Sequence, residues 1–136
     1  MSAIQTSPYI NFQGHAREAM EFYQQVLGGT LSLHTVDAQG VARPADPGDS
    51  ISYARLDADG VLIIGSDGHP SYPPTVGDNV AIAVSGTDKD RISAIFNGLA
   101  EGGNVKMPLS PQPWGGETGW LSDKFGMNWM VNVDKA

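Results

Sequence analysis

The amino-acid sequence predicts an α+β protein of two βαβββ modules, which form curved mixed sheets with the helices outside. Two amphipathic stripes each end at a double glycine, and an Asp-x-x-Gly motif occurs in each half. The 17 Gly and nine Pro also favour strands and turns over a helical bundle. We expect one domain over residues 1–136, with module 1 at about 7–67 and module 2 at about 78–134.

The first module carries the clearest helix signal. Apolar residues with the i, i+3, i+4, i+7 spacing predict a helix from Ala16 to Leu27, which ends at the glycine pair that follows. This stripe consists of Ala19, Met20, Tyr23, Val26 and Leu27. The segment Ala38 to Asp49 is rich in Pro and Gly and predicts a loop. The predicted strands of this module are Tyr9 to Gln13, Leu31 to Val36, Ile51 to Leu56 and Val61 to Gly65.

The second module repeats this pattern after a second predicted loop, His69 to Asp78. A helix is expected from Asp88 to Glu101, because an apolar stripe follows a capping residue and ends before Gly102. This second stripe consists of Ile92, Ile95, Phe96, Leu99 and Ala100. The predicted strands are Val80 to Val84, Val105 to Leu109, Gly119 to Leu121 and Met127 to Val133.

The two halves align as an internal repeat. Adding 73 takes Ala19 to Ile92 and aligns the apolar positions of the two helices. The later Asp-x-x-Gly motifs, which end at Gly60 and Gly126, differ by 66. A longer loop at Ala38 to Asp49 in the first half accounts for the difference of seven, 73 − 66.

Two aspartates open the Asp-x-x-Gly motifs. We interpret Asp57 and Asp123 as turn residues of two equivalent hairpins. An Asp side chain accepts hydrogen bonds from the backbone that follows it, which favours a turn.

The chain is acidic, with 15 Asp plus Glu against eight Lys plus Arg and a formal net charge of −7. Such a charge repels nucleic acids and anionic membranes, so neither is an expected partner. The chain has no Cys, which excludes disulfides and Cys-type zinc sites. It shows neither a signal-peptide pattern nor a long apolar run, and we expect a cytoplasmic protein.

Several segments resemble one known family. Residues Pro8–Phe12, Gly14–Tyr23 and Val26–Gly29 are similar to the opening of PhnB-like proteins, which belong to the glyoxalase/bleomycin-resistance, or vicinal-oxygen-chelate, superfamily. The ending Trp114–Val133 is a more specific match, and Gly65–Asp67 agrees in the middle. The resemblance implies paired βαβββ modules and a homodimer, but it does not settle the chemistry, because one fold hosts many activities.

The resemblance also implies where a metal would bind. In the metal-dependent enzymes of this superfamily, ligands come from the first and last strands of each module, typically with a Glu four residues after the hairpin Gly. Those last-strand positions are here Ile64 and Met130, which suit neither magnesium, manganese nor zinc. The first-strand positions fall near Tyr9 and near Asn79 or Val80. We therefore expect no metal and no cofactor.

The last predicted strand places three residues on one face. Asn128, Met130 and Asn132 alternate with residues of the opposite face, to which Trp129 belongs. If Met130 faces a cup between the sheets, both amides do so too. They then either contact a small ligand or bond to neighbouring backbone.

Other candidates come from both modules. Tyr53 stands where PhnB-like relatives often have His, and His69 lies at the predicted rim of the cup, where it is either an acid–base group or a solvated loop residue. We interpret His15 as a residue that caps or flanks the first turn of the first helix, and the role of His34 is undecided. Trp114, on a loop, is a candidate ligand or interface contact. The full set of candidate ligand-binding residues is Tyr9, Asn11, Tyr53, His69, Trp114, Asn128, Met130 and Asn132.

The resulting expectation is a PhnB-like, metal-independent protein that binds an unidentified small molecule. The alternatives are a glyoxalase-type lyase or isomerase, and a structural or regulatory dimer whose cup is filled by side chains. No nucleophile and base have a sequence spacing that indicates a catalytic pair, so we assign no catalytic residues. Some relatives carry a methyltransferase label, but the sequence lacks a Gly-rich nucleotide loop after a strand.

Overall fold

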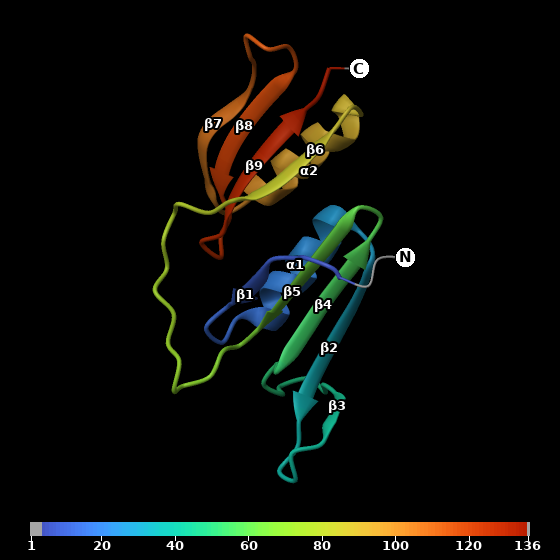
Figure 1. Cartoon of the computed structure of the whole chain (residues 1–136), viewed down its shortest axis with the longest axis vertical. Helices are drawn as coiled ribbons and strands as arrows, with labels where there is room; N and C mark the ends of the chain where they lie inside the picture. Colours follow the sequence, from blue (N-terminus) through green and yellow to red (C-terminus); the bar gives the residue numbers. More distant parts are fainter. Residues whose placement is uncertain (1–3, 136) are drawn as a thin grey trace. The chain divides into compact units, whose positions relative to one another are not determined.

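A computed structural model describes residues 4–135. The chain divides into two compact units, the first ending at Thr75 and the second beginning at Val76. Figure 1 shows both units, each with one helix and one mixed sheet.

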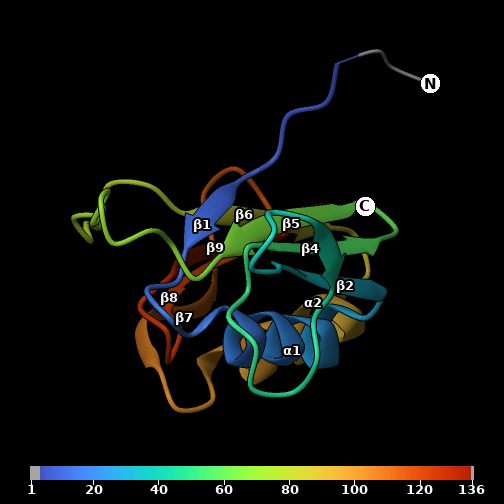
Figure 2. The same ribbon diagram turned by 90° about the horizontal axis from the view of Figure 1, so that it is seen from below.

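The first unit is a five-stranded sheet with one helix. Its order is β1-β5-β4-β2-β3, with β1 parallel to β5 and the other pairs antiparallel. Helix α1 packs on β2, β4 and β5, and Figure 2 shows it beneath these strands. The elements are β1 (Tyr9–Asn11), α1 (Ala16–Leu27), β2 (Thr30–Val36), β3 (Ala42–Pro44), β4 (Tyr53–Ala58) and β5 (Val61–Ser66).

Strand β3 lies inside a predicted loop, so the loop interpretation of Ala38 to Asp49 was wrong there. Asp37 Oδ1 accepts hydrogen bonds from two backbone N–H groups of the turn before β3, at 2.9 Å each. Pro44 is tolerated because β3 is an edge strand. On its outer side no neighbouring strand accepts a hydrogen bond, so the N–H that Pro lacks is not needed there. The predicted strand Tyr9 to Gln13 ends early, at Asn11, and Gln13 has a φ of 52°.

The second unit is a four-stranded sheet with one helix. Its order is β6-β9-β8-β7, with β6 parallel to β9 and the other pairs antiparallel. In Figure 1, α2 lies behind these strands. The elements are β6 (Ile82–Gly86), α2 (Lys89–Ala100), β7 (Asn104–Pro111), β8 (Glu117–Ser122) and β9 (Asn128–Val133). Strand β6 thus begins two residues later than predicted.

The internal repeat is confirmed by topology. Without β3, the strand orders β1-β5-β4-β2 and β6-β9-β8-β7 are equivalent, and each first strand is parallel to the last strand of its unit. The helices have 12 residues each and start 73 residues apart, at Ala16 and Lys89. Over residues 4–135, no helix is long and apolar enough to cross a membrane.

The two Asp-x-x-Gly motifs fold differently. In the first unit, Ala58 pairs with Val61, so the turn is the two-residue Asp59-Gly60 and Asp57 lies within β4. The interpretation of Asp57 as a turn residue was therefore wrong, because Asp-Gly is itself a preferred two-residue hairpin turn. In the second unit, Ser122 pairs with Asn128, and Asp123 does open the turn.

Candidate functional site

The alternation of side chains gives the first sheet a covered and an open face. Ala54 and Leu56 of β4 are fully buried on the α1 side, so Tyr53 and Arg55 point to the other side. Residues that pair across strands share a side, which extends this face across the sheet. The first open face, as we name it, contains Tyr9, Asn11, His34, Tyr53, Arg55, Ile64 and Ser66.

Two residues that we predicted to bind a ligand, Tyr9 and Asn11, lie next to Ser66 at the β1 edge of this face. Tyr9 Oη and Ser66 Oγ share a hydrogen bond of 2.5 Å, and Ser66 Oγ also accepts from the Gly68 N–H at 3.1 Å. Asn11, which pairs with Ser66, accepts from the Gln13 N–H at 2.9 Å through Oδ1. Tyr9 stays 58% exposed, so an anchored phenol ring is presented to solvent.

Tyr53 and His34 are neighbours on the same face. They pair across β4 and β2, and their ring centroids are 6.5 Å apart. His34 Nδ1 is buried without a hydrogen-bond partner among the described residues. Such an atom is unusual, because buried polar atoms are normally paired. The structure thus places His34, whose role the sequence left undecided, beside a predicted site residue.

Arg55 supplies a cation in the middle of the first open face. Its Nε donates to Asp57 Oδ2 at 2.8 Å. Hydrogen bonding to Asp57, and secondly to Tyr53, raises the pKa of the Arg55 guanidinium. Sequence reasoning missed Arg55, although residues two apart on a strand share a face and Tyr53 was a candidate.

The strand registers identify the four positions at which the resemblance implies metal ligands. Tyr9 pairs with Ile64, and Ala83 pairs with Met130. The expected first-strand position at Asn79 or Val80 was wrong, because β6 begins later than predicted. No group of three or more His, Cys, Asp or Glu side chains able to hold a metal ion occurs within residues 4–135. The four side chains offer a phenol, a thioether and two hydrocarbons, which do not fit a hard divalent ion.

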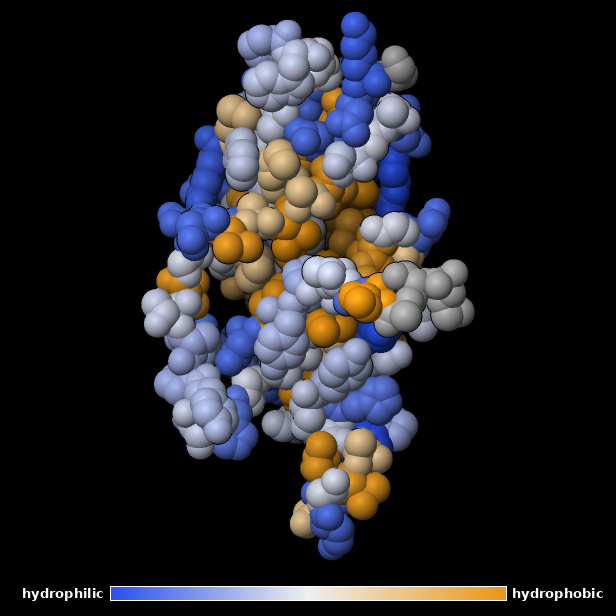
Figure 3. All heavy atoms as spheres, in the orientation of Figure 1, coloured by the Kyte–Doolittle hydropathy of each residue, from blue (hydrophilic) through white to orange (hydrophobic). Residues whose placement is uncertain are grey.

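The second sheet also has an open face. A Cβ at Gly119 would lie 2.6 Å from the Phe96 ring of α2, so Gly119 faces the helix and Trp120 points away from it. Figure 3 shows apolar side chains gathered over β6, β8 and β9 on the side toward the viewer, and α2 lies behind these strands in Figure 1. The second open face, as we name it, contains Met107, Thr118, Trp120, Ser122, Asn128, Met130 and Asn132.

The two predicted asparagines of this face have different surroundings. Asn128 is 7% exposed and donates to the carbonyls of Val80 at 3.2 Å and Gly77 at 3.4 Å, while its Oδ1 accepts from Ser122 Oγ at 2.8 Å. Asn128 therefore holds the chain that enters β6. Asn132 Oδ1 accepts from Thr118 Oγ1 at 2.6 Å, while its amide nitrogen has no acceptor in the described part of the chain.

A cavity of about 650 Å³ lies in the first unit, beside the start of α1. Asn11, Asp67 and His69 are among its lining residues. His69 Nδ1 accepts from the Ser71 N–H at 3.1 Å, and its ring lies 5.7 Å from that of Tyr72. The Asp67 carboxylate accepts from the backbone N–H groups of Ala16 and Ile51. The cavity is thus lined by two of the predicted ligand-binding residues, Asn11 and His69. It is also lined by Asp67, whose carboxylate is already hydrogen-bonded to the backbone.

Trp114 lies in the turn between β7 and β8 and is 73% exposed. Trp129 is fully buried, as its alternation with Met130 predicted. Trp120 is 41% exposed and stands between Met107 and Met130. The sequence did not reveal Trp120 as a surface residue. Its place beside Met130 depends on the register of the β8–β9 hairpin, whose length was not predictable.

Comparison with known proteins decides the family. A family model described as 3-demethylubiquinone-9 3-methyltransferase matches residues 4–132. The chain belongs to this family. A structure described as protein PA1353 from Pseudomonas aeruginosa is 39% identical, covers 98% of this chain and 100% of its own, and has a TM-score of 0.83.

Two further structures share the fold that the resemblance to PhnB-like proteins of the glyoxalase/bleomycin-resistance superfamily implies. A PhnB protein from Bacillus cereus, described as a putative 3-demethylubiquinone-9 3-methyltransferase, is 23% identical over 95% of this chain and 98% of its own, with a TM-score of 0.73. A member of the glyoxalase/bleomycin resistance protein/dioxygenase superfamily from Sphaerobacter thermophilus is 23% identical over 96% and 97%, with a TM-score of 0.58. At this identity both matches show the fold alone.

Proposed function

We propose that this PhnB-like protein binds a small molecule without a metal ion. The observation that carries the proposal is the set of side chains at the four ligand positions, Tyr9, Ile64, Ala83 and Met130. None of them is a carboxylate or an imidazole, the groups that hold zinc, manganese or magnesium in proteins. Recognition then depends on hydrogen bonds, ring contacts and charge.

Each open face supplies such groups. The first offers the exposed ring of Tyr9, the phenol of Tyr53 and the guanidinium of Arg55. The second offers Trp120 and the amide nitrogen of Asn132. Aromatic surface beside a few oriented polar groups is typical of small-molecule sites.

We do not propose a methyltransferase activity for this chain, although the family description names one. Nucleotide-like cofactors are commonly held by a Gly-rich loop between a strand and a helix. Here β1 leads to α1 through Phe12–His15, with a single glycine, and β6 leads to α2 through Thr87-Asp88.

Metal analysis combined with ligand screening tests the proposal. We expect the purified protein to hold well below one divalent ion per chain by elemental analysis. In a thermal-shift screen of small organic acids and aromatic compounds, at least one compound should raise Tm equally with and without EDTA, because a ligand that binds the folded state stabilises it. About one zinc, nickel or manganese ion per chain, whose removal abolishes every Tm shift, would contradict the proposal.

We further propose that the protein acts as a homodimer. Tyr72 is 77% exposed and Trp114 is 73% exposed, and both sheets end in edge strands with unpaired backbone groups. A specific interface that buries about 800 Å² on each partner would cover such groups.

Light scattering on a size-exclusion column should give twice the chain mass of 14.4 kDa at micromolar concentration. Trp114→Ser should shift the population toward the monomer, while Trp120→Leu should leave the mass unchanged. A mass near 14.4 kDa for the unaltered protein would refute the dimer.

A further inference from the structure

Three large side chains form a continuous row on the second open face. Trp120 pairs with Met107 on β7 and with Met130 on β9. Adjacent strands are about 4.8 Å apart, so the row extends about 10 Å across the sheet. Thioether groups make favourable contacts with aromatic rings and adapt to their shape. The row is therefore suited to a flat aromatic molecule.

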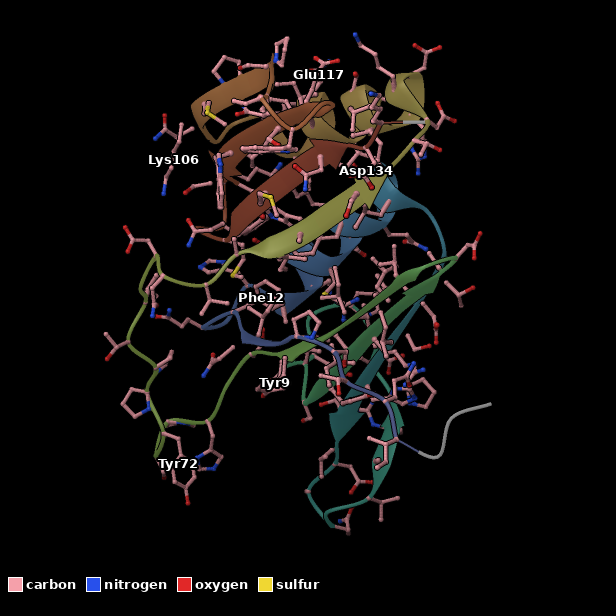
Figure 4. The ribbon with its side chains drawn as sticks, turned by 45° about the horizontal axis from the view of Figure 1, so that its top comes forward. Tyr9, Phe12, Tyr72, Lys106, Glu117 and Asp134 are labelled. Atoms are coloured by element: carbon pink, nitrogen blue, oxygen red, sulfur yellow. The ribbon has the colours of Figure 1, made fainter. Side chains whose placement is uncertain are left out.

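A β-bulge adds a positive charge beside this row. The register shifts between Val105 and Met107, and Lys106 is the extra residue. Bulges re-aim a side chain, and here Lys106 Nζ lies 3.4 Å from Asn128 Oδ1 at one end of the face. Figure 4 shows Lys106 well apart from Glu117 on the same sheet.

Lys106 has no carboxylate partner among the described residues. In contrast, Lys89 pairs with Glu117 at 2.9 Å and Arg55 with Asp57 at 2.8 Å. Within β6–β9, Lys106 is also the one charged side chain on the second open face. In a chain with a net charge of −7, a cation without a carboxylate partner beside apolar side chains favours an anionic occupant.

We propose that the second open face binds a planar aromatic anion, such as an aromatic carboxylate. The ring stacks on Trp120 and contacts Met107 and Met130, while the anionic group pairs with Lys106. This inference rests on the proposed function and names the chemical class of its ligand.

Isothermal titration calorimetry with three matched probes tests the inference. 2-Naphthoate is planar and anionic, 2-naphthamide is planar and neutral, and decahydro-2-naphthoate is anionic but not planar. We expect 2-naphthoate to bind at least about tenfold more tightly than either of the others. This comparison uses the unaltered protein, so it does not depend on the folding of any variant.

Two variants assign the binding to the named residues. Trp120→Leu should weaken 2-naphthoate binding by about tenfold, and Lys106→Gln should abolish the preference for 2-naphthoate over 2-naphthamide. The matched controls are Val105→Ala and Lys135→Gln, which remove an exposed apolar side chain from the opposite face of β7 and an exposed lysine elsewhere in the unit. Both controls should keep the affinity of the unaltered protein.

Other results overturn the inference. Equal binding of planar and saturated acids, no binding of 2-naphthoate, or a loss of affinity in Val105→Ala instead of Trp120→Leu would each refute it. A Trp120→Leu variant that changes the oligomeric mass would make this face an interface between copies and also refute it. The proposed function would survive these results if a non-aromatic compound raised Tm in the presence of EDTA, and it would fail if no compound did.

Discussion

Replacing Asp123 with Ala should lower the free energy of unfolding of the second unit by about 3–5 kcal/mol. Asp123 is 4% exposed, and both oxygens of its carboxylate accept hydrogen bonds. Oδ1 accepts from the N–H groups of Phe125 at 2.8 Å and Met127 at 3.0 Å, and Oδ2 accepts from Trp129 Nε1 at 2.9 Å. The alanine variant leaves these donors unpaired, and the indole is fully buried, where no water replaces the bond.

Urea unfolding is monitored by tryptophan fluorescence for the second unit and by the near-UV circular dichroism of tyrosine for the first unit, which contains all four tyrosines. All three tryptophans, Trp114, Trp120 and Trp129, lie in the second unit. The internal repeat supplies the control, Asp57→Ala, because Asp57 occupies the same place in the first motif. Its side chain is 52% exposed, and within residues 4–135 it pairs only with Arg55. An exposed ion pair contributes little stability, so this variant should lose far less. Equal losses in the two variants would show that burial of Asp123 is not the cause.

The helices were predictable because their signals are local. The apolar stripe and the following glycine gave α1 its observed bounds, and Asp88 caps α2 by accepting from the Arg91 N–H at 3.1 Å. Strand β3 was not predictable in this way, because it forms only by pairing with β2 at the sheet edge. Asp57 and Asp123 likewise begin the same four-residue motif, yet the turns differ. Two residues, Asp59-Gly60, separate the paired Ala58 and Val61, whereas residues 123–127 separate the paired Ser122 and Asn128.

The candidate site was predictable where strand alternation alone decides the face. Asn128, Met130 and Asn132 do share one face. Trp120 and Lys106 depend on a pairing register and a bulge, which are set by contacts between strands and leave no simple pattern along the chain. The same holds for Asn128, whose amide is occupied by carbonyls about 50 residues away in the sequence.

The start of α1 leads to the second large prediction. His15, at the N-cap position, makes no capping hydrogen bond with its side chain. Asp67 takes over this task from 51 residues away, because its Oδ1 accepts from the Ala16 N–H at 2.9 Å. Its Oδ2 accepts from the Ile51 N–H at 2.6 Å, and so one carboxylate ties the helix start to the chain that enters β4.

Asp67→Ala should therefore lower the free energy of unfolding of the first unit by about 2–4 kcal/mol, because it removes a helix cap and a second charge-assisted hydrogen bond. The control is Asp88→Ala, which removes only the local cap of α2 and should cost about 1 kcal/mol. Hydrogen exchange measured at fixed protein concentration would report each helix separately, with faster exchange in α1 for the first variant and in α2 for the second. If Asp67→Ala left exchange in α1 unchanged, the carboxylate would not anchor the helix. It would then be a polar group free to serve the adjacent cavity, in which His69 and Asn11 already lie.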